Sequence, residues 1–97
     1  MVVGVLEITL GIPGAFSLKE KRGVVRKVVN RLQNRFNVAV AEVGQNDIQN
    51  RAVIGVSVVS NDAAVANSVL DKVLDATESI GAGMADVLDT RLELINF

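Results

Sequence analysis

Apolar residues alternate with other residues along four segments of the chain and recur at helical spacing along two. Alternation is typical of half-buried β-strands, and it occurs, completely or in part, in residues 2–10, 38–43, 51–60 and 84–96. Helical spacing of apolar positions occurs in residues 18–35 and 62–79. The predicted order along the chain is therefore strand, helix, strand, strand, helix, strand.

Both predicted helices begin after residues that favour N-caps. Ser17 and Glu20 have the spacing of a capping box, in which each side chain accepts a hydrogen bond from a free backbone N–H group. Asp62 ends a run of three polar residues that supplies cap chemistry for the second helix. Gly81 and Gly83 are expected to end that helix.

This order predicts an α+β domain of ferredoxin-like type. Two strand–helix–strand units joined by a hairpin form a four-stranded antiparallel sheet. Right-handed crossovers then place both helices on one face of the sheet. Ninety-seven residues are enough for one such domain, which we assign to residues 1–97.

The sheet face away from the helices is predicted to mix valines with charged residues. In the first strand, Leu6, Ile8 and Leu10 share the inward face. The predicted open face carries Val3, Val5, Glu7, Val38, Val40, Glu42, Val53, Ser57, Val59, Asp89, Arg91 and Glu93. We interpret Val3, Val5, Val38, Val40 and Arg91 as candidates for contact with a protein partner or a second copy. The alternative is a solvated sheet with scattered apolar residues, which is common.

The charge of the chain is unevenly distributed. Between Ser17 and Phe36 there are seven basic residues and one acidic residue, whereas the rest of the chain has three basic and ten acidic residues. The outward-facing candidates for phosphate binding are Lys19, Arg22, Arg26, Lys27 and Arg31. Lys21 and Arg35 are expected to lay their aliphatic stems along the ends of the buried stripe. The alternative is a solvated helix whose charges complement the acidic second helix.

The sequence lacks residue types that several kinds of catalytic and metal site require. The chain has no cysteine and no histidine, which removes thiolate sites, the commonest general base and the commonest transition-metal ligand. Glu7 lies in the first predicted strand and Glu42 in the second. The third strand separates these two strands in the expected sheet order, so the two carboxylates do not form a catalytic pair. We therefore expect no enzyme activity, no metal and no cofactor. No apolar run approaches the length of a membrane span, and a cytoplasmic location without membrane partners is expected.

Two segments carry a resemblance to a known family. Residues 17–22, Ser-Leu-Lys-Glu-Lys-Arg, and residues 36–44, followed by Asp47, resemble the YlxP-like family of bacterial proteins of unknown function. The resemblance implies a ferredoxin-like fold. Members lie near genes for translation initiation and ribosome maturation factors, which implies a connection with RNA or the ribosome. It brings no catalytic residues to carry over.

These observations lead to one functional hypothesis and one alternative. The hypothesis is a non-enzymatic domain that binds RNA or the ribosome through its basic first helix. The alternative is a protein-interaction or homodimerisation module that uses the open sheet face or an edge strand.

Overall fold

The computed structural model describes all residues, 1–97, and confirms the predicted order and fold class. Its elements are β1 (Val2–Gly11), α1 (Leu18–Arg35), β2 (Ala39–Gly44), β3 (Arg51–Ser60), α2 (Ala63–Gly81) and β4 (Asp86–Asn96). The boundaries of α1 and β3 agree with the predicted ones, and the others differ by at most two residues. Neither helix combines the length and the apolar character that a membrane-spanning segment needs.

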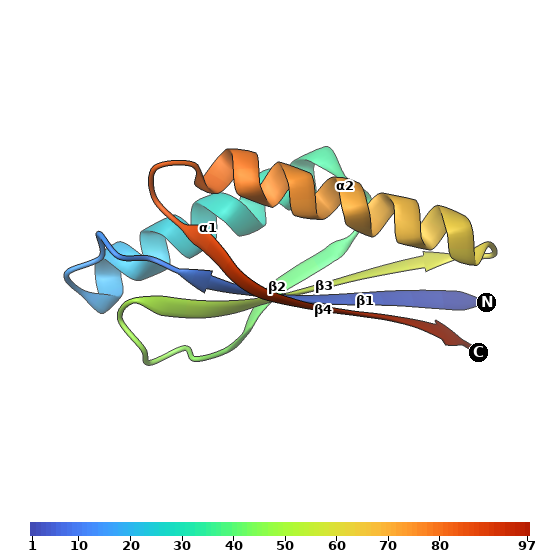
Figure 1. Cartoon of the computed structure of the whole chain (residues 1–97), viewed down its shortest axis with the longest axis horizontal. Coiled ribbons are helices and arrows are strands. Elements are labelled where there is room, and N and C mark those ends of the chain that lie inside the picture. Colours follow the sequence, from blue (N-terminus) through green and yellow to red (C-terminus); the bar gives the residue numbers. More distant parts are fainter.

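The four strands form one antiparallel sheet in the order β2-β3-β1-β4, with both helices on one face (Figure 1). β1 pairs with β3 on one side and with β4 on the other, so it lies at the centre. The two chain ends lie side by side at one end of the sheet (Figure 1). There the N–H of Phe97 donates to the Met1 carbonyl at 2.8 Å, and the N-terminal amine donates to the Phe97 carbonyl at 3.1 Å.

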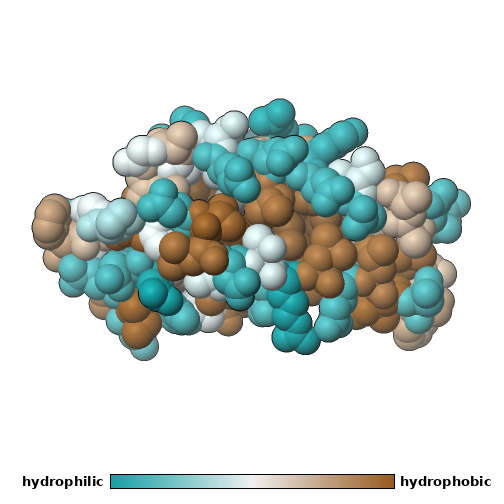
Figure 2. Space-filling view, in the orientation of Figure 1, coloured by the Kyte–Doolittle hydropathy of each residue, from teal (hydrophilic) through white to brown (hydrophobic).

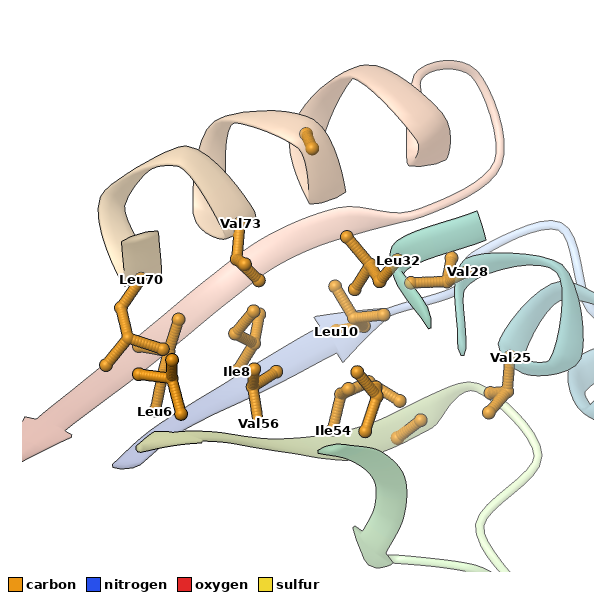
Figure 3. Packing of buried hydrophobic residues seen from close by; sticks show 14 of the residues in the cluster. Leu6, Ile8, Leu10, Val25, Val28, Leu32, Ile54, Val56, Leu70 and Val73 are labelled. Atoms are coloured by element: carbon orange, nitrogen blue, oxygen red, sulfur yellow. The ribbon is translucent and has the colours of Figure 1, made fainter. Parts of the chain in front are cut away.

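The core lies between the sheet and the two helices (Figure 3). Leu6, Ile8 and Leu10 of β1 are buried as predicted, and they contribute to a single apolar cluster. The other labelled members come from β3, α1 and α2, and they are Ile54, Val56, Val25, Val28, Leu32, Leu70 and Val73. On α2, Ala66, Leu70, Val73 and Ala76 form the buried side, whereas Val65 is 51% exposed.

Two glycines allow close approaches within the sheet. A methyl group at Gly4 would lie 2.9 Å from Leu70 Cδ1, so the absence of a side chain lets α2 pack directly onto β1. A methyl group at Gly55 would lie 2.8 Å from Val43 Cγ1, at the point where the pairing of β2 with β3 shifts by one residue. A glycine inside a strand is typical of such a close approach.

The predicted orientation of β2 is wrong. Val40 pairs with Val56 and Glu42 pairs with Ile54, and both partners face the helices. Val40 is buried, and Val38 packs against the same core. Val40 is therefore a core residue and Val38 packs against the core, so neither is part of an open interaction face. Successive side chains of a strand point to opposite faces. Assigning one residue of β2 to the wrong face therefore places all of its residues on the wrong face.

Candidate nucleic-acid interface

The first turn of α1 is fixed by its cap. The backbone N–H of Glu20 donates to Ser17 Oγ at 3.1 Å. The Glu20 carboxylate turns back and accepts a hydrogen bond from the Phe16 N–H at 2.7 Å. The predicted capping box is confirmed, with the carboxylate reaching one residue beyond the cap. Glu20, the one acid of α1, is thus held at the start of the helix, where it also interacts favourably with the helix dipole.

Lys21 is fully buried, contrary to the expectation that its ammonium would reach solvent at the end of the apolar stripe. Its Nζ lies 2.7 Å from Glu42 Oε2 and donates to the carbonyls of Gln45 and Asn46 at 2.9 and 3.0 Å. The contact with Glu42 has the distance of an ion pair but not the angles of a hydrogen bond. The ammonium therefore ties α1 to the end of β2 and to the loop that follows it.

The sequence carries a signal for this ion pair. Lys21 stands four and seven residues before Val25 and Val28, so it occupies the same helical stripe as the core valines. Glu42 is in phase with Val38 and Val40 along β2. A basic residue in the buried stripe of a helix and an acidic residue in the buried phase of a strand are electrostatic complements. Together they predict a buried pair, because a lone buried charge is unfavourable.

The remaining basic residues of the helix stay on its outer side. We call Lys19, Arg22, Arg26, Lys27 and Arg31 the basic face. All are exposed except Lys27, which is half-buried and has its Nζ 3.9 Å from Met84 Sδ. Lys19, Arg22 and Arg26 are three and four residues apart, so they form one line along the helix. Lys27 and Arg31 lie at the side of this line, and Arg31 borders a shallow depression with Asn34, Arg35 and Ile80.

The basic face is not neutralised by neighbouring acids. The chain contains two ion pairs within 4 Å, Lys21–Glu42 and Arg91–Glu93, and neither involves the basic face. The acidic residues of α2 form no ion pair with α1. Arg35 lies with its guanidinium carbon 5.5 Å from the centre of the Phe36 ring, a stacking contact at the end of the helix. The basic residues of α1 are therefore not joined to the acidic second helix by direct ion pairs.

The open sheet face differs from the predicted one at β2. Val3, Val5 and Arg91 face away from the helices as expected, and β2 presents Ala39, Ala41 and Val43 there in place of the predicted residues. A groove of about 330 Å³ runs between β1 and β2, with Gly55 in its lining. Glu7 lies on this face and Glu42 on the other, so the two carboxylates are not brought together.

Arg91 is the centre of a small charged cluster on the open face. Its guanidinium donates to Glu93 Oε1 at 3.0 Å, and its register partner on β1 is Glu7. The hydrogen bond to Glu93 and the negative charges of Glu93 and Glu7 raise the pKa of Arg91 above its ordinary value. Nowhere in the chain do three or more acidic side chains gather in a way that could hold a metal ion.

Comparison with known proteins identifies the family. Residues 3–92 match the family model described as "Protein of unknown function (DUF503)". The chain is a member of the DUF503 family. It is 36% identical over 78 residues to the "Uncharacterized protein YlxP" of Bacillus subtilis (strain 168), which covers 80% of this chain and 85% of the relative. The resemblance seen in the sequence is therefore confirmed.

Solved structures with this fold show how widely it is used. The "Putative Chlorite dismutase TA0507" matches the DUF503 chain with a TM-score of 0.59 and 8% identity, over 99% of this chain and 45% of that one. The de novo designed protein Ferredog-Diesel matches with a TM-score of 0.53 and 14% identity, over 94% and 83%. SnoaB, a cofactor-independent oxygenase from Streptomyces nogalater, matches as its N63A mutant with a TM-score of 0.52 and 12% identity, over 99% and 92%. At these identities the matches show the fold alone.

The structure divides the segment that carries the family resemblance into two parts. Ser17, Glu20 and Lys21 have structural roles, because they cap α1 and anchor the loop after β2. Lys19 and Arg22 are exposed and form neither a hydrogen bond through their side chains nor an ion pair. In this DUF503 protein, folding accounts for the first part of the segment and not for the two outward charges.

Proposed function

We propose that this protein is a non-enzymatic RNA-binding domain that holds the phosphate backbone against the basic face of α1. The observation that carries the proposal is that five cationic side chains share the outer side of one helix without an acidic partner. Replacing exposed side chains that have no ion-pair partner usually changes stability little. A polyanion is the partner that such a surface complements.

The dimensions of the basic face suit a short stretch of nucleic acid. Lys19 and Arg31 are twelve residues apart, which corresponds to about 18 Å along the helix axis. Such a length allows contact with several successive phosphates of one strand. The main contribution to binding is then the release of counterions, which carries little information about base sequence.

An exposed aromatic residue lies at one end of this surface. Phe16 immediately precedes the cap of α1 and is 83% exposed. An exposed phenylalanine has no packing role, and a solvent-exposed aromatic ring is a stacking platform for an unpaired base. We therefore propose that the domain prefers single-stranded RNA, such as a loop or an end, to a continuous duplex.

Fluorescence anisotropy with a labelled 20-nucleotide single-stranded RNA tests the proposal. The test variant is Arg22→Glu with Arg26→Glu. The matched control is Arg51→Glu with Lys72→Glu, which changes the net charge equally at exposed residues outside α1. We expect the α1 variant to lose at least about tenfold in affinity and the control less than about twofold. Equal losses in the two variants would show that only net charge matters, and the proposed interface would be wrong.

Salt dependence and Phe16 provide two further measurements in the same assay. Occupation of four or five phosphates predicts that log K falls with log salt with a slope of about −3, and that each basic residue removed reduces the slope by about 0.7. Phe16→Ala is expected to weaken binding of the single strand several-fold and to leave binding of an RNA duplex of equal length unchanged. A wild-type protein that binds neither RNA in low salt contradicts the proposed function.

A further inference from the structure

The two edge strands of the sheet, β2 and β4, differ in length and in how far their edges are covered. β2 is six residues long, and its pairing with β3 is interrupted after Glu42. The Val40 carbonyl of β2 also accepts a hydrogen bond from Gln33 Nε2 of α1 at 3.1 Å. β4 is eleven residues long and contains no proline. A long, uncovered edge strand is a template for pairing with another strand.

The pairing of β4 with β1 shows which backbone groups point outward. Met1 and Phe97 exchange backbone hydrogen bonds, so they form a hydrogen-bonded pair of the antiparallel ladder. Hydrogen-bonded and non-hydrogen-bonded pairs alternate along such a ladder. Counting back from Phe97 through the unshifted register, the N–H and C=O groups of Thr90, Leu92 and Leu94 point away from β1. These groups are free to pair with another strand.

Apolar side chains accompany this free edge on the side of the helices. Leu88, Leu92 and Leu94 are 49%, 39% and 37% exposed. Leu92 and Leu94 pair with Leu6 and Gly4, so they share the inward face of the sheet. α2 packs closely onto β1 at Gly4, and β4 extends beyond its cover. Figure 2 shows the resulting apolar surface below α2 on the side where β4 lies.

Charges on the other face of β4 favour a second copy as the partner and one register in which opposite charges meet. Asp89, Arg91 and Glu93 succeed one another on this face with alternating sign. If an identical β4 lies antiparallel with its two-fold axis at Leu92, Arg91 of each copy faces Glu93 of the other. An axis at Arg91 would place two arginines opposite each other, and an axis at Glu93 two glutamates. An axis at Thr90 would draw Leu88, where the pairing of β4 with β1 shifts, into the ladder.

We propose that two copies of this protein associate through β4 to form a continuous eight-stranded sheet, with the two-fold axis at Leu92. Leu92 meets Leu92 of the second copy at a hydrogen-bonded position, and Thr90 meets Leu94. These pairs supply about six backbone hydrogen bonds. The Arg91–Glu93 contacts fall at the non-hydrogen-bonded positions, where side chains are closest. The interface is distinct from the basic face, and it leaves both α1 helices on the same side of the joined sheet.

Sedimentation velocity and cysteine crosslinking test the interface in the intact chain. The protein contains no cysteine, so one introduced thiol reports one position. Leu92→Cys is expected to form an intermolecular disulfide on oxidation, because Cα atoms of a hydrogen-bonded pair lie about 5.5 Å apart. Val59→Cys, on an exposed residue of β3, is the control and is expected to stay reduced. If Val59→Cys forms a disulfide and Leu92→Cys does not, the contact lies on the open sheet face and the proposal is wrong.

Charge exchange tests the register. Arg91→Glu and Glu93→Arg each place like charges opposite each other, so each is expected to weaken the dimer at least about tenfold. Combining the two substitutions restores opposite charges and is expected to recover dimerisation. Circular dichroism of each variant monitors folding. A sedimentation coefficient of a monomer for the wild-type protein at 100 μM, or a double variant no better than the single ones, would refute the proposed dimer.

Discussion

The two helices have nearly equal lengths and pack on the same face of the sheet, yet they use their outer and inner sides differently. α1 has eighteen residues and buries a charged residue, Lys21, among its apolar ones. α2 has nineteen residues, and its buried polar side chain is Thr77, whose hydroxyl donates to the Val73 carbonyl within the same helix. On the outside, α1 is basic and α2 is acidic. Packing requires one apolar stripe from each helix but does not determine the charge of its outer side. The difference in outer charge therefore points to function and not to folding.

The largest expected effect comes from the buried charge that only α1 has. Lys21→Met leaves Glu42 with no cation and the Asn46 carbonyl with no donor, while the Gln45 carbonyl keeps the N–H of Ile48. We expect a loss of about 3 kcal/mol in the free energy of unfolding, measured by urea denaturation. Adding Glu42→Leu should recover much of this loss, because the unpaired carboxylate is then removed. Thr77→Val on α2 is the matched control.

The control separates a buried charge from a buried hydroxyl. Thr77 satisfies its hydrogen bond within α2, so its replacement by valine is expected to change stability by about 1 kcal/mol or less. If Lys21→Met were as mild as Thr77→Val, the ion pair would not hold the loop after β2. The two helices would then differ only on their outer sides.

The same ion pair explains which part of the fold could be predicted from the sequence. The boundaries of α1 follow from Ser17, Glu20 and the apolar stripe, all of which are local signals. The orientation of β2 depends on Glu42, which an isolated pattern places in solvent. Its actual partner, Lys21, lies twenty-one residues earlier in the chain. Without this non-local partner Glu42 favours the outward face, although Val38 and Val40 of the same phase lie against the core.

The exposure of β4 was not predictable for a related reason. The alternation of its leucines predicts the inward face correctly, but their burial depends on how far α2 extends over the sheet. The outward position of Lys19, Arg22 and Arg26 was predictable from helical spacing alone. The structure adds that these residues have no ion-pair partner. Binding of RNA by these residues stays a prediction.

A smaller effect on stability is expected from replacing two glycines, one inside α1 and one after the end of α2. Gly23 lies in the middle of α1, is exposed and has no atom within 4 Å of the position that a side chain would occupy. Gly23→Ala is expected to stabilise the protein by about 0.5–1 kcal/mol in the same denaturation experiment. Gly83, after α2, has a φ of +82°, and Gly83→Ala is expected to destabilise. An equal gain at both positions would contradict this explanation.

The smallest expected change in stability is also the one that separates folding from function. Arg22 and Arg26 are one turn apart and repel each other, whereas Glu followed by Arg at this spacing attracts. Arg22→Glu is therefore expected to stabilise the protein by about 0.3–0.5 kcal/mol and, in the anisotropy assay, to reduce RNA affinity several-fold. Thermal unfolding and RNA binding measured on one preparation would detect both changes. If replacing Arg22 stabilises the helix, Arg22 lowers the stability of the fold. Binding of an anion at that surface would explain why an arginine is present there. If the variant loses stability and keeps its affinity, Arg22 belongs to the fold and the functional contrast between α1 and α2 disappears.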